Sequence, residues 1–178
     1  MPSPEHQITV TIPVIQTERL VLREPREADF PAMLAFNDSP RAAFVGGGAL
    51  RQQVWRGLRA NIGLWALRGH GIFSVDTKAG DFIGRIGVLF YDGWDEPEFG
   101  CHLFDGYKGQ GLAIEAARAA RAWLFATQGL ATLVSYIDPA NAGSVAVAER
   151  LGARRDHVAE AAIGHDCLVY RHLPETAR

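Results

Sequence analysis

The chain has 178 residues, of which 48% are apolar and 21% are charged, and its formal net charge at pH 7 is −2. These values are typical of one globular domain, so we expect a single domain over residues 1–178 with loose tails at 1–7 and 174–178. The small net charge excludes an electrostatic case for binding nucleic acid or an anionic membrane. No apolar run approaches the length needed to cross a bilayer.

The N-terminus lacks a basic region followed by an apolar segment, so we expect no signal peptide and a cytoplasmic location. Two cysteines, Cys101 and Cys167, lie in strand-like segments and lack the spacing of a metal site. We expect both to be reduced core residues, and we predict no metal ion.

The first third of the chain combines short strands with two helices. β-rich segments occur at Ile8–Pro13 and at Thr17–Glu24, where polar and apolar residues alternate. Helices are predicted at Glu27–Phe36 and Leu50–Leu67, because apolar residues recur there every three or four positions. Between them, Gly46–Gly48 is predicted to be a flexible turn.

Three strands with short connections follow, at Gly71–Asp76, Phe82–Tyr91 and Glu96–Phe104, and such a meander is expected to be antiparallel. The middle strand is nearly all apolar, which predicts a central position covered on both faces. Gly84 and Gly87 within it indicate a bulge or a close backbone approach.

The last third alternates helices and strands. The helix predicted at Leu112–Thr127 carries a solvated stripe of Glu115, Arg118 and Arg121. The remaining predicted elements are a strand at Thr132–Ile137, a helix from its cap Asn141 to Leu151, and a closing hairpin of Val158–Ala162 and Cys167–Leu173 through Gly164. The result is a mixed α+β fold, with a mainly antiparallel sheet of about seven strands and helices on both faces. One crossover makes two neighbouring strands parallel.

A glycine-rich turn precedes the best predicted helix. The segment Gly106–Ala116 reads Gly-Tyr-Lys-Gly-Gln-Gly-Leu-Ala-Ile-Glu-Ala and follows an apolar strand. Gly109 and Gly111 allow positive φ and close approach of a ligand. The first helical turn offers unpaired N–H groups and the positive end of the helix dipole, and Lys108 adds a charge. The pattern predicts a pyrophosphate cradle; in the alternative interpretation, the glycines only allow tight packing.

Two better-known phosphate motifs are absent. The chain contains no Gly-x4-Gly-Lys-Ser/Thr string. A dinucleotide fingerprint needs a third glycine three positions after the second, where this chain has Ile114, and it occurs early in a βαβ unit rather than past mid-chain.

The motif Lys108-x-x-Gly111-x-Ala113 resembles the Gln/Arg-x-x-Gly-x-Gly/Ala signature of the GNAT superfamily of N-acetyltransferases, with Lys in the first position. The surrounding Gly-x-Gly-Leu-Ala-x-Glu-Ala is most similar to the branch that acetylates ribosomal-protein N-termini at alanine or serine. The opening strand, Thr-x-Arg-Leu-x-Leu-Arg from Thr17, resembles the same branch. The predicted order β-α-α-β-β-β-α-β-α-β-β is also that of the family.

This resemblance implies that Gly46–Gly48, between the first two helices, is a mobile lip of the acceptor site; the alternative is a plain surface loop. It also implies acetyl-CoA as co-substrate. Its pyrophosphate would bind the backbone N–H groups of a six-residue segment, namely Lys108, Gly109, Gln110, Gly111, Leu112 and Ala113. Its pantetheine arm would run along the strand residues Cys101, His102 and Leu103.

Acyl transfer to an amine needs a neutral amine, a donor for the developing oxyanion and a proton for the departing thiolate. Asn141-x-x-Ser144 matches a motif of the branch, which implies that Asn141 contacts the pantetheine arm and that Ser144 acts as donor or acid at the thiolate. The alternative is that Asn141 is an N-cap and Ser144 a small first-turn residue. One side chain can serve both purposes.

The general base is less clearly marked. Glu98 occupies the position where the branch commonly has Glu before an aliphatic residue and Gly, and strand alternation places it on the same face as its rival His102. A solvated strand-edge glutamate is an equal alternative. Tyr136 is a second candidate acid or a wall of the substrate site. Asp156 matches a position where the branch often has Glu, but the departures Glu to Asp and Phe to Ala at Ala153 weaken any role for it.

The leading hypothesis is an acetyl-CoA-dependent N-acetyltransferase that moves the acetyl group directly to a primary amine in a ternary complex. The first alternative is a non-catalytic acyl-CoA-binding or sensing domain on the same fold. A second keeps the glycines for packing alone and predicts no binding of CoA. The acceptor stays open among a protein N-terminus, an antibiotic amine, a polyamine and a metabolite amine. Exposed strand edges would permit a homodimer.

Overall fold

The computed structural model describes residues 9–163 and 166–174. The strands are β1 (Ile15–Gln16), β2 (Leu20–Arg23), β3 (Ile72–Thr77), β4 (Phe82–Leu89), β5 (Glu98–Leu103), β6 (Leu133–Ile137), β7 (Arg154–Arg155) and β8 (Leu168–His172). The α-helices are α1 (Phe30–Asn37), α2 (Arg51–Arg68), α3 (Leu112–Thr127), α4 (Ala142–Arg150) and α5 (His157–Ile163), and short 3-10 helices η1 (Glu27–Asp29) and η2 (Pro40–Val45) flank α1.

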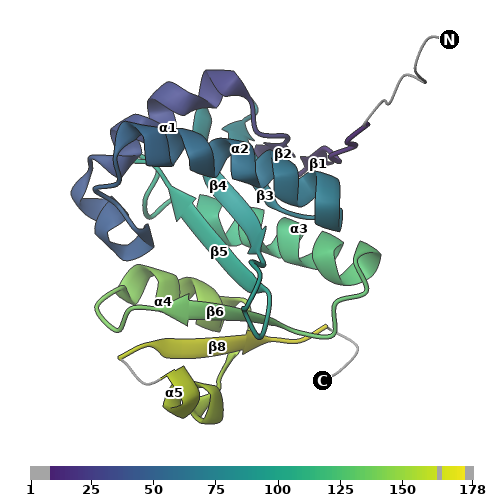
Figure 1. The fold of residues 1–178 in the computed structure, drawn as a ribbon, viewed down its shortest axis with the longest axis vertical. Coiled ribbons are helices and arrows are strands. Elements are labelled where there is room, and N and C mark those ends of the chain that lie inside the picture. The colour runs from purple at the N-terminus through teal and green to yellow at the C-terminus, as the bar shows by residue number, and fades with distance from the viewer. Residues whose placement is uncertain (1–8, 164–165, 175–178) are drawn as a thin grey trace, which may run out of the picture.

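The described residues form one eight-stranded sheet in the order β1-β2-β3-β4-β5-β6-β8-β7 (Figure 1). All neighbouring strands pair antiparallel except β5 and β6, which are parallel and joined through α3. The predicted mixed, mainly antiparallel sheet is therefore confirmed. Within the described ranges it has eight strands rather than about seven, because two-residue strands extend it at both edges.

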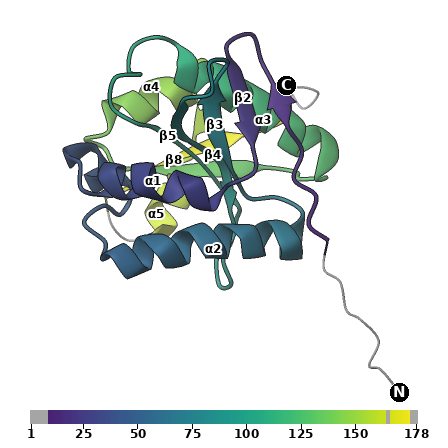
Figure 2. The same ribbon diagram turned by 90° about the horizontal axis from the view of Figure 1, so that it is seen from above.

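Helices cover both faces of this sheet, with α1 and α2 on one side and α3 on the other (Figure 2). Alternate strand residues pack beneath α3, and small alanines on its inner side let the helix approach the sheet closely. The fully buried members of this core cluster include Leu22, Phe73, Val75, Ile86, Val88, Ala116, Ala120 and Leu124.

A buried ion-pair network holds α1 against the opposite face. Arg23 of β2 donates from Nη2 to Asp29 Oδ1 at 2.7 Å and from Nε to Asp76 Oδ2 at 2.6 Å. The Ser74 hydroxyl of β3 also donates to Asp29, at 2.7 Å. Because both carboxylates are directly paired, the network fixes the start of α1 relative to β2 and β3.

Gly84 of β4 marks a close approach of two backbones, as its place in an apolar strand predicted. A Cβ at this position would overlap the carbonyl oxygen of His102 on β5. Register also shifts between Val75 and Asp76 of β3, opposite this part of β4.

Two predicted strands are wrong. Residues 158–162 belong to α5 rather than to a hairpin, since Asp156 caps the helix by accepting the Ala159 N–H at 3.0 Å and alanines favour helix. β7 is the strand that pairs with β8 instead. At the N-terminus, residues 9–13 form no strand; Val10 and Ile12 pack against the core without ladder hydrogen bonds, and Pro13 has no N–H to donate.

The predicted tail at 1–7 and nearly all of that at 174–178 lie outside the described residues, as does the predicted turn at residue 164.

Candidate active site

The glycine-rich turn between β5 and α3 has the geometry of an anion cradle. Gly106, Gly109 and Gly111 have φ of 89°, 80° and 76°, in the left-handed region that favours glycine. A Cβ at Gly106 or Gly109 would meet open space. The first intrahelical hydrogen bond of α3 runs from the Glu115 N–H to the Gly111 carbonyl, so the preceding N–H groups of the turn have no helical partner. These residues fit the phosphate chemistry of an acetyl-CoA pyrophosphate.

Glu115 fixes this turn to the beginning of the sheet. Its carboxylate accepts the Thr17 hydroxyl at 2.6 Å, the Arg19 backbone N–H at 2.9 Å and Arg19 Nε at 2.6 Å. Arg19 also donates from Nη1 to the Gln110 carbonyl at 2.9 Å. The predicted solvated stripe is thus wrong for Glu115, and also for Arg121, which is buried and donates to the Leu151 carbonyl.

The sheet opens between the two parallel strands. β5 pairs with β6 at one position, Glu98 with Val134, whereas β5 pairs with β4 along its whole length. Directly after the paired residues, the Ser135 hydroxyl of β6 bridges the gap by donating a hydrogen bond to the Phe99 carbonyl of β5 at 2.6 Å. Beyond it, residues 100–103 form an edge that leads directly to the glycine turn. The predicted pantetheine residues Cys101, His102 and Leu103 all lie on this edge.

The start of α4 carries Asn141 and Ser144. Asn141 Oδ1 accepts the Ser144 backbone N–H at 3.1 Å, so Asn141 is an N-cap, as the alternative without a ligand contact predicts. Both side chains are partly exposed. Within residues 9–163 and 166–174, the Ser144 hydroxyl has no hydrogen-bond partner, which leaves it free to donate to a ligand.

The two candidate bases of β5 differ sharply in basicity. Burial raises the pKa of Glu98 to about 7. Burial, with the positive charges of Arg85 and Arg41, lowers the pKa of His102 to about 3, so the imidazole is neutral at physiological pH. Glu98 is half-buried rather than a solvated edge residue. Tyr136 lies on the same face of the sheet as Glu98. Glu98 is in register with Val134 of β6, and Tyr136 follows Val134 by two residues.

Burial raises the pKa of the Tyr136 phenol, and the neighbouring carboxylates of Glu96 and Glu98 add to the effect. Tyr136 therefore stays protonated and can donate a hydrogen bond at neutral pH. The Cys101 thiol has its pKa raised to about 12 by burial, and so it is no nucleophile. Both cysteines are free thiols.

Asp156 has a structural explanation. Besides capping α5, it accepts Arg171 Nε at 2.7 Å, and Arg171 also pairs with Glu96 through both nitrogens of its fork. These contacts join β8 to the loop before β5.

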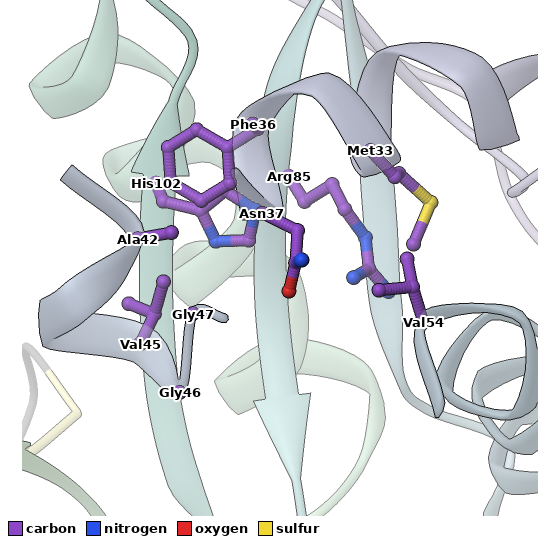
Figure 3. Close-up of a pocket in the computed structure, with 10 residues that line it drawn as sticks. All are labelled: Met33, Phe36, Asn37, Ala42, Val45, Gly46, Gly47, Val54, Arg85 and His102. Atoms are coloured by element: carbon purple, nitrogen blue, oxygen red, sulfur yellow. The ribbon is translucent and has the colours of Figure 1, made fainter. Parts of the chain in front are cut away.

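A pocket of about 100 Å³ lies on the face of the sheet that carries Glu98 and His102. It is enclosed by β4, β5 and the segment from α1 to α2 (Figure 3). Ten residues line it: Met33, Phe36, Asn37, Ala42, Val45, Gly46, Gly47, Val54, Arg85 and His102. The predicted lip at Gly46–Gly48 thus borders a pocket. It is tied to α1, since Asn37 exchanges two hydrogen bonds with the backbone of Ala49 and accepts the Gly48 N–H on its carbonyl.

Sequence reasoning missed Arg85 and the aromatic wall of this pocket. Phe36 of α1 stacks on His102 with ring centroids 4.7 Å apart and planes 10° apart. Arg85 is the single charge in an otherwise apolar strand, and that isolation was the available signal. The lining residues come from five segments, namely α1, η2 with the glycines after it, α2, β4 and β5, and no local pattern could bring these segments together.

Within residues 9–163 and 166–174, no group of three or more His, Cys, Asp or Glu side chains could hold a metal ion. None of the helices in this part of the chain is long and apolar enough to cross a membrane.

A family model described as an acetyltransferase (GNAT) domain matches residues 19–154. The protein YkkB of Bacillus subtilis is 27% identical over 146 residues, which are 76% of this chain and 82% of that protein. The crystal structure of an acetyltransferase from Agrobacterium tumefaciens is 38% identical with a TM-score of 0.84, covering 96% of this chain and 99% of that one. RimL, a ribosomal-protein α-N-acetyltransferase solved in complex with coenzyme A, shares the fold at 18% identity and a TM-score of 0.69, covering 90% and 98%. The chain therefore belongs to the GNAT acetyltransferase family, and it is an N-acetyltransferase that uses acetyl-CoA as its co-substrate.

Proposed function

We propose that the protein transfers the acetyl group directly to a primary amine in a ternary complex at the opening between β5 and β6. The observation that carries this proposal is the separation of these strands after Glu98 and Val134, beside the glycine turn. The open edge of β5 leads directly into the glycine turn, so an extended ligand can contact both. This arrangement suits a ligand with an extended amide-containing arm and a pyrophosphate.

In this proposal, the backbone N–H groups of residues 108–113 bind the pyrophosphate, and the edge at residues 101–103 exchanges main-chain hydrogen bonds with the pantetheine arm. Asn141 combines its capping role with a contact to that arm. When bound, acetyl-CoA supplies the activated thioester.

Glu98 is the proposed base. It takes the proton of the amine directly or through water, and a pKa of about 7 suits a base that works near neutral pH. His102 is the weaker base, because its pKa of about 3 leaves little driving force for proton transfer at pH 7. As the N–C bond forms and the C–S bond breaks, one proton leaves the nitrogen for Glu98.

The departing sulfur needs one proton in return. Ser144 on the first turn of α4 is the proposed donor: its hydroxyl hydrogen-bonds to the thiolate, or passes it a proton that solvent replaces on the serine oxygen. The free hydroxyl and the positive end of the helix dipole support this role. Tyr136, protonated at neutral pH, is the second donor or a wall of the acceptor site. Positioning of amine and thioester supplies much of the rate.

Steady-state kinetics with both substrates varied test the direct mechanism. The assay would follow CoA release with a panel of peptide N-termini, amino acids, polyamines and antibiotic amines. Intersecting double-reciprocal lines are expected, with no CoA released in the absence of an amine. Parallel lines together with an acetylated protein in mass spectrometry would contradict direct transfer.

A further inference from the structure

The pocket beside His102 contains a cation, Arg85, that has no partner among the described residues. Arg85 lies in the middle of β4, in register with Ser74 on β3 and His102 on β5, and its side chain extends toward Met33 and Val54 (Figure 3). Its Nε is shielded from solvent and has no hydrogen-bond partner in the part of the chain that the structure describes. No hydrogen bond or ion pair of Arg85 occurs with any residue in the ranges 9–163 and 166–174.

The nearby carboxylates are already engaged by another arginine. Arg23 pairs with Asp29 at 2.7 Å and with Asp76 at 2.6 Å, and Asp29 also accepts the Ser74 hydroxyl. Asp29 attracts Arg85 only from a distance, through its charge. Burial lowers the pKa of Arg85 to about 10, so the guanidinium is still charged at neutral pH.

The rest of the pocket adds no second charge. His102 is neutral at physiological pH and stacks on Phe36. The Asn37 amide is occupied by Ala49. Apart from these groups, the lining consists of aliphatic side chains, Met33 and backbone glycines. A small, largely apolar pocket with one unpaired guanidinium is complementary to a single anionic group on a short carbon stem.

The planar guanidinium favours a planar anion. Its parallel N–H groups match the two oxygens of a carboxylate, and such bidentate pairs are the stronger and more specific ones. A volume of about 100 Å³ suits a carboxylate and a few carbons better than a long chain.

We propose that Arg85 binds a carboxylate of the acceptor, so that the substrate is a small primary amine carrying a carboxylate group. This inference rests on the proposed transfer to an amine, because it assigns the pocket to the acceptor. The pocket lies on the same face of β5 as Glu98, since residues 98 and 102 are separated by an even number of positions. Polycationic acceptors and peptide N-termini without a nearby carboxylate are disfavoured.

The test compares each of a series of α- and ω-amino acids with the amide of the same compound, which has the same size and no negative charge. Wild-type protein should use the carboxylate member with a kcat/KM about tenfold or more above that of the amide. Arg85→Met should bring this ratio close to one, and Arg85→Lys should retain part of it. Arg56→Met, which removes an exposed arginine of α2, should leave the ratio unchanged.

Equal use of acid and amide by the wild type would overturn the inference, as would an unchanged ratio in Arg85→Met. Thermal unfolding should show Arg85→Met to be as stable as wild type, because the variant removes an unpaired charge; a large loss would indicate a structural role instead. If no amine is acetylated, thermal unfolding of wild type and Arg85→Met is measured with glutarate and with its diamide. Stabilisation of the wild type by glutarate but not by the diamide, and its loss in Arg85→Met, supports the carboxylate site. Absence of any acetyl-CoA response would contradict the proposed function separately.

Discussion

Arg19 and Glu115, 96 residues apart in the chain, form a two-point contact at the entrance of the glycine turn. The Glu115 carboxylate accepts the backbone N–H of Arg19 at 2.9 Å and its Nε at 2.6 Å. Arg19 then reaches the Gln110 carbonyl within the turn itself, at 2.9 Å. The first strands of the sheet thus hold the segment that we propose to bind pyrophosphate.

Arg19→Met should weaken acetyl-CoA binding without unfolding the protein. The Arg19 side chain is about half exposed, and exposed ion pairs contribute little, so we expect a rise in Kd of about two- to fivefold. Isothermal titration calorimetry with Arg19→Met, Glu115→Gln and the double variant measures it. A double variant whose effect equals the sum of the two single effects would argue against their joint action on the turn.

Glu98→Gln should lower kcat by about a hundredfold or more while leaving acetyl-CoA affinity intact. Wild-type kcat/KM should rise with pH through about 7, since the base must lose its proton. Glu98→Gln should lose this limb and keep only the one contributed by the acceptor amine. A limb that persists in Glu98→Gln and disappears in His102→Gln would transfer the role to His102.

The same substitution should change how stability depends on pH. Glu98 has a folded-state pKa of about 7 and a reference value of 4.5, so between these values the unfolded chain loses a proton that the folded chain retains. The wild type therefore loses stability as pH rises through this window. In denaturant unfolding, the free energy of unfolding of Glu98→Gln relative to the wild type should therefore increase from pH 5 to pH 8. The same difference in free energy at both pH values would contradict the burial of this carboxylate.

Glu160→Gln provides a control of opposite sign. Hydrogen bonding to Arg155 is the main cause that lowers the pKa of Glu160 to about 2, so ionised Glu160 stabilises the fold at pH 8. This variant should be less stable than the wild type there.

Two substitutions of Asn141 separate its capping role from ligand binding. Asn141→Ala should destabilise the protein by about 1 kcal/mol, because α4 loses the acceptor for the Ser144 N–H. Asn141→Asp retains this acceptor and should retain stability, but it lacks the amide donor and should raise the Kd for acetyl-CoA. If Asn141→Asp binds acetyl-CoA with the Kd of the wild type, Asn141 only caps α4 and does not bind the ligand.

The sequence predicted the elements whose signals are local. Leu112–Thr127 is helical over its predicted range, because a glycine turn begins it and Gly129 follows it, and Asn141 was recognisable as a cap. α5 was missed although its own cap, Asp156, stands before it; the predicted strand began at Val158, and β-branched residues favour strands.

The site could be predicted only in part. The glycine turn is contiguous, and so its conformation follows from its residues. The opening after Glu98 and Val134 depends on strand register, and the pKa of Glu98 depends on burial by distant segments. Arg85 could be noticed as a lone charge in β4, but its lack of a partner follows from tertiary structure, because Arg23 takes the nearby carboxylates.

The most direct test of the account is thermal unfolding with and without acetyl-CoA for wild type, Gly111→Trp and Gly129→Trp. Both glycines have positive φ, 76° and 62°, so the two substitutions impose similar backbone strain at opposite ends of α3. Saturating acetyl-CoA should stabilise the wild type and Gly129→Trp, by about 2.7 kcal/mol at a hundred times Kd. A folded Gly111→Trp should show no stabilisation. Stabilisation of Gly111→Trp equal to that of the wild type, or none in the wild type, would contradict binding of the pyrophosphate in this turn.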